Sequence, residues 1–365
     1  MVPARRVPLR LRTASRRHRR HPCTCFRRWL IRTGSRSVAT VYRRPKSQGQ
    51  RWPDEGGSAL LRWLAKRIIA AALVVFVVTS LVFVVTHIFT DPATVSLPLE
   101  ASQEDRASRR ASLGLDRPLS VQYWDFLSGL VVGDLGESFF QTQPASKLVF
   151  ERLPATLRLV AGATAVTVLM AAPMGMLAAW WERRFADHAV LGFSMASISA
   201  PPFWIGYLLI IVFAVQLGWV PTFGSRGFVS LILPSFAIGL ASAGRLAQMT
   251  RRGIVEELRK PYAVTALSRG FSRSYTIVHH TFRNVASGFV TMTGWEVTRM
   301  FTGYTVVIEV VFSWPGVGRL AVEAINDRDL ILVQAAVVVL ATMVVLTNLL
   351  VDIARRLIDP RVDLA

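Results

Sequence analysis

The sequence predicts an all-α protein that crosses a membrane several times, on the basis of composition, apolar runs and charge distribution. The chain has 365 residues, of which 52% are hydrophobic and 18% are charged, and its mean hydropathy is +0.39. A soluble domain carries about 25% charged residues. The apolar residues form long uncharged stretches, whereas the basic residues gather between these stretches and near the start of the chain.

Six stretches are candidate transmembrane helices, because the hydrocarbon core of a bilayer needs roughly 20 apolar residues per helix. The stretch over residues 285–311 contains Glu296, Arg299 and Glu309, whereas the other five are nearly free of charge. Glu296 and Arg299 are three positions apart, so they share a helix face and can neutralise each other. A surface helix is the alternative for this segment. The predicted spans are about residues 68–90, 157–181, 190–215, 229–249, 285–311 and 330–353.

The third predicted span contains an interruption. Pro201-Pro202 lies in its middle, and proline lacks the backbone N–H that continues a helix, while its ring clashes with the preceding turn. Membrane helices tolerate such breaks where neighbouring protein or a cavity satisfies the freed carbonyl groups. A kink beside a transport path and a purely structural kink both fit the pattern.

The charges between the spans predict the topology. Residues 250–284 contain seven basic and two acidic residues, whereas residues 90–154 contain six basic and nine acidic ones. Since cytoplasmic loops are rich in Lys and Arg, the first segment is predicted to be cytoplasmic and the second external. Six spans then place both termini in the cytoplasm. Residues 97–154 are expected to form an external cap of short helices, with a turn at Gly133-Asp-Leu-Gly136.

Residues 1–58 are expected to form a disordered, basic cytoplasmic tail. The first 60 residues contain 16 Lys and Arg residues but only two acidic residues. They lack the apolar core of a secretory signal. One alternative for this segment is an organellar transit peptide. The other is that translation starts at a later codon, such as that of Val41 or Leu60.

No metal site is expected in this chain. The only cysteines, at positions 23 and 25, lie in the tail beside two histidines, and their spacing is poor for zinc. His279 and His280 are interpreted as part of a polar cytoplasmic face. Met170, Met174 and Met176 are interpreted as packing residues.

The basic segment 254–284 has the pattern of a helix, a glycine break and a second helix. Glu256–Ser268 is predicted to form the first helix, Gly270 to end it, and Ser272 or Ser274 to cap the next one. A short helix held beside the membrane by two spans is suited to transmit force from a partner. A basic loop that anchors the membrane surface is the alternative.

Several motifs together resemble one known family. Tyr262-Ala-Val-Thr-Ala-Leu-Ser-Arg-Gly270, followed after nine residues by His280-Thr-Phe-Arg-Asn284, is similar to the coupling-helix signature of ABC importer permeases of the dipeptide and oligopeptide (Dpp/Opp) type. The resemblance covers Leu61 to the C-terminus and departs from the family at two places. The acidic residue that begins the general signature is replaced by Val264, and Gly288 stands where a proline is common. Further matching motifs include Leu113-Gly-Leu-Asp-Arg-Pro118, Glu151-Arg-Leu-Pro-Ala-Thr-Leu157, Leu217-Gly-Trp-Val-Pro221 and Trp314-Pro-Gly-Val-Gly-Arg319.

The resemblance implies a type I ABC importer transmembrane domain over residues 59–365, in the plasma membrane of a bacterium. It implies four kinds of partner: a second homologous permease, two ATPase subunits, an extracytoplasmic substrate-binding protein and the lipid bilayer. Nucleic acid is not an expected partner. The implied cargo is a dipeptide or oligopeptide, with nickel chelates, glutathione or haem as alternatives. A secondary transporter, which needs no ATPase, is the competing class.

The chain itself is not expected to be an enzyme or to hold a cofactor. It contains no Gly-x-x-x-x-Gly-Lys-[Ser/Thr] loop for ATP phosphates, so ATP and Mg²⁺ are expected on the partner ATPase subunits. No catalytic residue is predicted. The buried ionisable candidates for a translocation path are Arg245, Glu296, Arg299 and Glu309. The residues expected to couple the chain to an ATPase are Glu257, Tyr262, Thr265, Ala266, Ser268, Arg269 and Gly270.

Overall fold

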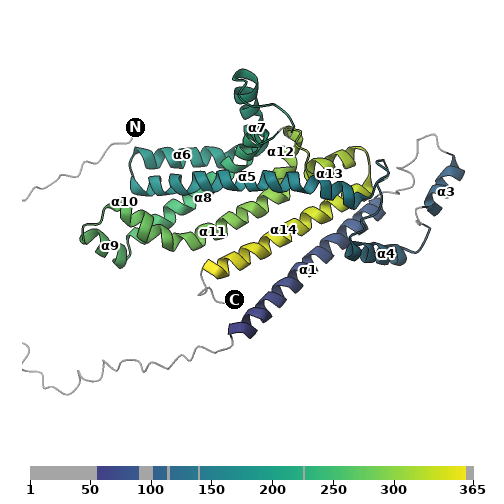
Figure 1. The fold of residues 1–365 in the computed structure, drawn as a ribbon, viewed down its shortest axis with the longest axis horizontal. Coiled ribbons are helices and arrows are strands. Elements are labelled where there is room, and N and C mark those ends of the chain that lie inside the picture. Colours follow the sequence, from purple (N-terminus) through teal and green to yellow (C-terminus); the bar gives the residue numbers. More distant parts are fainter. Residues whose placement is uncertain (1–55, 90–101, 113–115, 139, 225–226, 359–365) are drawn as a thin grey trace, which may run out of the picture. The chain divides into compact units, whose positions relative to one another are not determined.

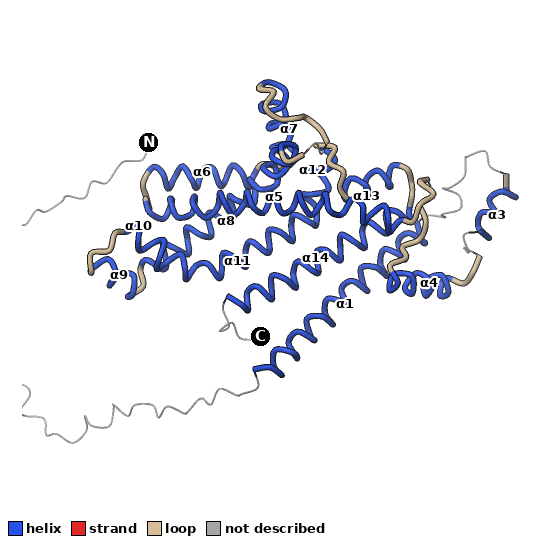
Figure 2. The backbone as a smooth tube through the Cα atoms, in the orientation of Figure 1, coloured by secondary structure: helices blue, strands red, loops and turns tan. Residues whose placement is uncertain are grey.

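The computed structural model describes residues 56–89, 102–112, 116–138, 140–224 and 227–358 (Figure 1). These residues form helices joined by loops, and no strand occurs among them (Figure 2). The expectation of an all-α protein is therefore confirmed for this part of the chain. The predicted basic tail up to residue 55, with both cysteines, lies outside the described residues.

Four helices in the described residues are long and apolar enough to cross a membrane. They match four of the six predicted spans in position, although each of them extends beyond the predicted limits at one end. The apolar part of the first runs from Arg62 to Thr86, and that of the last from Leu330 to Arg356. The four are α1 (Gly56–Phe89), α5 (Ala145–Trp180), α8 (Val229–Leu258) and α14 (Leu330–Ile358).

The third predicted span is a bent pair of helices rather than one straight helix. Helix α6 (Phe185–Ser199) is followed by α7 (Pro202–Leu209) and the π-helical segment η1 (Ile210–Gln216). The chain bends by 104° between α6 and the continuous segment that α7 and η1 form. Ala200 and Pro201 have extended backbone between them, and Pro202 begins the second helix. The predicted interruption at the proline pair is thus confirmed. The pair is either one broken span or a re-entrant loop.

The fifth predicted span corresponds to three helical segments in direct succession. These are α11 (Phe282–Arg299), the π-helical segment η3 (Met300–Tyr304) and α12 (Thr305–Val311). The run is not among the candidate membrane helices of the described residues, because charged and hydroxyl side chains lower its hydropathy. The membrane crossing of this run stays a prediction.

The predicted external cap contains two short helices, α3 (Gln103–Ser112) and α4 (Leu119–Val132). Gly133 and Gly136 have φ angles of 83° and 84°, a left-handed conformation that favours glycine, so the predicted turn is confirmed. Helix α5 already begins at Ala145 and continues through Pro154, so the last part of the predicted cap is helical, and the position at which this helix enters the membrane stays a prediction.

Helix α4 packs against α1 through aromatic side chains. The ring of Phe83 lies 5.2 Å from that of Tyr123 and 5.5 Å from that of Phe126, measured between centroids. The hydroxyl groups of Tyr123 and Ser80 are 2.5 Å apart. This contact fixes α4 beside the second half of the apolar stretch of α1.

Helix α13 (Val317–Asn326) packs with the start of α5 and with α14. Buried Leu148, Leu320 and Leu332 belong to one apolar cluster there. Buried Asp329 accepts hydrogen bonds from the Ser138 hydroxyl at 2.5 Å and from the Leu332 backbone N–H at 3.1 Å. The segment before α5 is therefore tied to the start of α14.

Among the described helices, α5 and α8 make the most extensive contact (Figure 1), and small residues let their backbones approach closely. A Cβ atom at Gly239 would lie 2.9 Å from the carbonyl oxygen of Ala163, and one at Gly175 would lie 2.9 Å from that of Ala247. Small residues at such contacts are typical of helix packing in membranes. Helices α6, α7 and α11 pack against α8, and α13 and α14 pack against α5.

Candidate functional site: the coupling region and an ionisable cavity

The predicted helix Glu256–Ser268 is interrupted. Helix α8 ends at Leu258, Lys260 is extended, and Pro261 begins a separate helix, α9 (Pro261–Ser268). The residue before a proline is disfavoured in the helical region, because the proline ring clashes with it. The prediction of one helix over this range was wrong, and Pro261 is the signal that it overlooked.

The end of α9 agrees with the sequence pattern. Gly270 has a φ angle of 89°, which an L-residue with a side chain rarely adopts. The Ser272 hydroxyl accepts a hydrogen bond of 3.2 Å from the Tyr275 backbone N–H, so it caps the short helix α10 (Arg273–Tyr275). The π-helical segment η2 (Thr276–Thr281) then leads into α11. The glycine break and the serine cap are both confirmed.

A hydrogen-bonded group holds α9 against the ends of α8 and α11. The Tyr262 hydroxyl donates to the Glu257 carboxylate and accepts a hydrogen bond of 2.9 Å from the Asn284 amide. Lys260 donates to the same carboxylate at 2.5 Å. One tyrosine thus joins the last turn of α8 to the first turn of α11.

The electrostatics of this group favour the protonated forms of Tyr262 and Lys260. Burial raises the pKa of the Tyr262 hydroxyl, and the adjacent Glu257 carboxylate raises it further. The same carboxylate raises the pKa of Lys260 through their hydrogen bond. Both groups therefore keep their protons, and remain donors to Glu257, throughout the physiological pH range.

The opposite side of α9 is open. Thr265, Ser268, Arg269 and Gly270 are exposed and Ala266 is half-buried, while Ala263 is fully buried beneath the helix. The two hydroxyl groups donate to backbone carbonyls of their own helix. Among the described residues no acidic side chain pairs with Arg269. The predicted coupling residues thus divide into an anchor, Glu257 with Tyr262, and an exposed face.

Two acidic residues that the sequence analysis did not single out anchor the same end of the helices. Buried Asp187 accepts hydrogen bonds from both Arg251 Nε and Arg251 Nη2, the latter at 2.6 Å, and one of 2.8 Å from the Arg183 backbone N–H. Glu182 lies 3.3 Å from Arg259 and 3.7 Å from Arg273. These contacts join the first turn of α6, and the connection that precedes it, to α8 and α10. Their partners are distant in sequence, so no local pattern could have revealed them.

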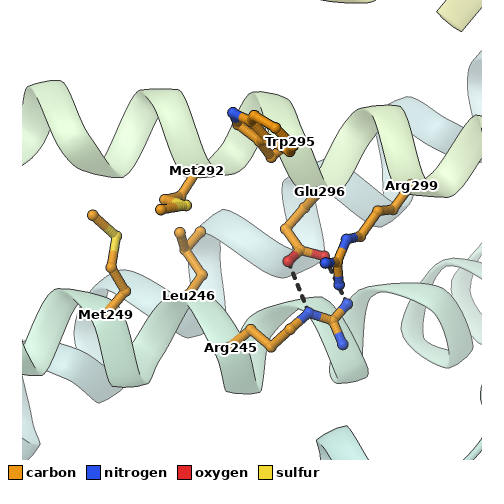
Figure 3. A pocket seen from close by; sticks show the side chains of 7 residues that line it. All are labelled: Arg245, Leu246, Met249, Met292, Trp295, Glu296 and Arg299. Atoms are coloured by element: carbon orange, nitrogen blue, oxygen red, sulfur yellow. Dashed lines mark hydrogen bonds and ion pairs between the residues drawn. The ribbon is translucent and has the colours of Figure 1, made fainter.

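A cavity of about 320 Å³ lies between α8 and α11 (Figure 3). Arg245 of α8 donates two hydrogen bonds to Glu296 of α11, of 2.8 Å from Nε and 2.7 Å from Nη2. The predicted mutual pairing of Glu296 and Arg299 was wrong, because Arg245 occupies the carboxylate from across the helix interface. The cavity is lined by Arg245, Leu246, Met249, Met292, Trp295, Glu296 and Arg299.

Glu309 does not line this cavity and lies elsewhere among the helices. It is fully buried, and its carboxylate accepts hydrogen bonds of 2.7 Å from the Thr156 hydroxyl and 3.0 Å from the Arg319 backbone N–H. The second bond comes from the first turn of α13, where backbone N–H groups and the helix dipole favour an anion. In this structure Glu309 connects α5, α12 and α13.

The fold and these sites define a class of protein: a multi-pass helical membrane protein whose long helices carry a short anchored helix with an exposed face at one end. The chain belongs to the family of inner membrane components of binding-protein-dependent transport systems. The model of that family matches residues 171–364, and the model of its N-terminal part matches residues 60–160. The chain is therefore an ABC importer permease of the inner membrane, as the motifs indicated.

Curated relatives agree with this assignment. The chain is 35% identical over 304 residues to the glutathione transport system permease protein GsiC of Escherichia coli O6:H1, and 34% identical to GsiC of Salmonella typhi. Each comparison covers 83% of this chain and 99% of the relative.

Proposed function

We propose that this chain is the permease subunit of an ATP-driven importer for peptides or small peptide-like solutes such as glutathione. The observation that carries the proposal is α9, which is anchored to two long helices by Tyr262 and leaves its other face uncovered. A helix held in this way moves with α8 and α11 when a partner pushes on it. Separate ATPase subunits, which hold the ATP and Mg²⁺, are the proposed partners of that face.

The rest of the assembly follows from the same proposal. The basic residues of 250–284 favour a cytoplasmic position for α9 and for both termini. A second homologous permease completes the transport path, and a substrate-binding protein delivers the solute from outside. ATP binding closes the ATPase pair, displaces the coupling helices and exposes the path alternately to the two sides.

The substrate class rests on the relatives, whose names state glutathione transport. Glutathione is a tripeptide-like solute, so it falls within the peptide class that the sequence motifs resemble. Nickel chelates and haem are the alternatives for the same fold. A secondary transporter is disfavoured by membership of a binding-protein-dependent family.

The coupling proposal is tested with Gly270→Pro and Ala266→Asp in the complete complex. Proline cannot adopt the φ angle of 89° at this position, and a carboxylate at position 266 places a charge on the docking face. Both changes are expected to abolish uptake and substrate-stimulated ATP hydrolysis, while subunits still co-purify.

Ala107→Asp on α3 is the matched control, because it introduces the same side chain at an exposed position outside the coupling region. It is expected to leave both activities unchanged. Normal uptake by either coupling variant would refute the docking assignment. Full uptake by the permease alone, without an ATPase, would refute the importer class itself.

A further inference from the structure

We propose that the cavity between α8 and α11 binds a carboxylate group of the transported solute and that Arg299 is the residue that contacts it. The inference rests on the proposed function, since it concerns the path of an importer, and it adds a ligand class. That class is a small solute with a free carboxylate, such as the C-terminus of a peptide or either end of glutathione.

The charges of the cavity leave one cation uncompensated. Two arginines and one glutamate line it, and Arg245 and Glu296 satisfy each other through two hydrogen bonds. Among the described residues no acidic side chain lies within salt-bridge distance of Arg299. Figure 3 shows its side chain pointing toward the Arg245–Glu296 pair, beside Glu296 of the same helix. The cavity therefore presents a guanidinium that is available to an anion.

The position of Arg299 along its helix makes lipid an unsuitable neighbour. The residue is exposed and lies well inside the continuous helical run from Phe282 to Val311. A charged side chain at the centre of a bilayer costs roughly 2.5–3.5 kcal/mol on insertion scales, so such residues face protein or a water-filled path. A guanidinium also matches a carboxylate in shape, because both are planar and form two parallel hydrogen bonds.

The opposite wall is fixed. Besides its bonds to Glu296, Arg245 donates to the Ser242 hydroxyl at 3.3 Å and lies 6.0 Å from the centre of the Tyr304 ring. These contacts hold the Arg245 guanidinium in place, and its two hydrogen bonds in turn hold the Glu296 carboxylate. The pair thus keeps Glu296 from neutralising Arg299, which remains free for an incoming anion.

The remaining walls suit the apolar parts of a small solute. Leu246, Met249, Met292 and Trp295 line the cavity; the exposed fraction of Trp295 is 63% and that of Met292 is 43%. Methionine adapts to side chains of different shape. A volume of about 320 Å³ is at the lower end of the range for small-molecule sites, roughly 300–1,000 Å³. One charged contact, from Arg299, beside adaptable apolar walls fits a transport path that accepts peptides of many different sequences.

The test measures binding to the complete transporter, with the second permease and the ATPases, in nanodiscs and without the binding protein. The probes are radiolabelled trialanine and trialanine amide, which differ in the C-terminal carboxylate. Wild type is expected to bind trialanine roughly tenfold more tightly than the amide, as one charge-assisted pair predicts. Arg299→Gln should weaken trialanine binding to the level of the amide without changing amide binding.

Two further variants keep the test decisive. Arg299→Lys retains the charge and should keep part of the preference for trialanine. Arg328→Gln removes one exposed positive charge outside the cavity and should leave both affinities unchanged. Three outcomes would each overturn the inference. Wild type could bind the two probes with equal affinity, Arg299→Gln could weaken the binding of both probes equally, or wild type could fail to bind trialanine.

Uptake in the presence of the binding protein separates the two proposals. If wild type takes up trialanine or glutathione and Arg299→Gln binds trialanine as wild type does, the carboxylate inference fails and the proposed function stands. If wild type takes up neither solute, the proposed substrate class fails. If Arg299→Gln weakens the binding of both probes equally and the second permease no longer co-purifies, Arg299 pairs with the second permease instead.

Discussion

The Thr156 hydroxyl connects three elements through two hydrogen bonds. It donates to the buried Glu309 carboxylate at 2.7 Å and accepts from the Val317 backbone N–H at 2.9 Å. Gly318 leaves room for that carboxylate, because a Cβ atom there would lie 2.9 Å from Glu309 Oε2. The glycines of the motif that begins at Trp314 thus have a packing reason.

Thr156→Val is expected to destabilise the permease. The substitution keeps the shape of the side chain but leaves a carboxylate oxygen and a backbone N–H without a partner, and each buried unsatisfied group costs about 1–3 kcal/mol. Thermal unfolding in nanodiscs measures the effect. Thr164→Val is the matched control on the same helix, since the Thr164 hydroxyl donates to the carbonyl of its own helix at Val160. Equal melting temperatures for both variants would show that the Thr156 bridge contributes nothing.

Tyr262→Phe is expected to weaken coupling rather than folding. It removes the hydroxyl that joins Glu257 to Asn284, a contribution of roughly 0.5–1.5 kcal/mol for a typical hydrogen bond. Substrate-stimulated ATP hydrolysis should fall several-fold while the complex still assembles. Tyr275→Phe, which keeps its ring stacking on His279, is the control and should retain full stimulation.

The same contact makes a prediction for pH. The pKa of Tyr262 is raised relative to an exposed tyrosine, so its contribution is complete below the unfolded pKa of about 10 and is lost only as the pH rises through the folded pKa. The difference in stimulation between Tyr262→Phe and wild type should therefore be constant from pH 6 to pH 9. A difference that disappears within this range would contradict the assigned role.

At the scale of elements, the first turn of α6 is held to α8 by a buried ion pair. Asp187 is 1% exposed and is bonded to Arg251 by two hydrogen bonds. Removing one member of a buried pair leaves the other charge without compensation, which costs about 3–5 kcal/mol. The pair therefore contributes to the alignment of α6 with α8.

Asp187→Asn is accordingly expected to lower the melting temperature strongly and to reduce the yield of assembled complex. Glu151→Gln provides the contrast, because its partner Lys147 is 4.0 Å away and both side chains are more than half exposed. An exposed pair contributes about 0–1 kcal/mol. If the two substitutions shift the melting temperature equally, the buried pair has no special role.

The elements differ in how far they could be predicted from the sequence. Long apolar runs identify α1, α5, α8 and α14, because hydropathy is a local property. The bend at Pro201 and the break at Gly270 follow from local backbone chemistry as well. The pairing of Arg245 with Glu296 could not be predicted, since a shared helix face suggested Arg299 and only the packing of α8 on α11 brings the true partner close.

At the scale of the whole molecule, the total number of basic residues and their positions suggest different functions. The 43 basic residues of the chain suggest nucleic-acid binding at first sight. Within the described residues, however, basic side chains around α8, α9 and α10 are partly neutralised by Asp187, Glu182 and Glu257. What remains exposed on α9 is a limited surface beside Arg269. The functional information is thus in the position of these charges rather than in their sum.

The close contact of α5 with α8 restricts how such a molecule can change shape. Where a glycine on one helix leaves no space for even a methyl group beside the carbonyl of the other, the two helices cannot slide past one another without a clash. They must travel as one rigid body. Any hinge has to lie elsewhere, and the 104° corner at Pro201 and the π-helical turn after Arg299 are where the backbone already departs from a regular α-helix.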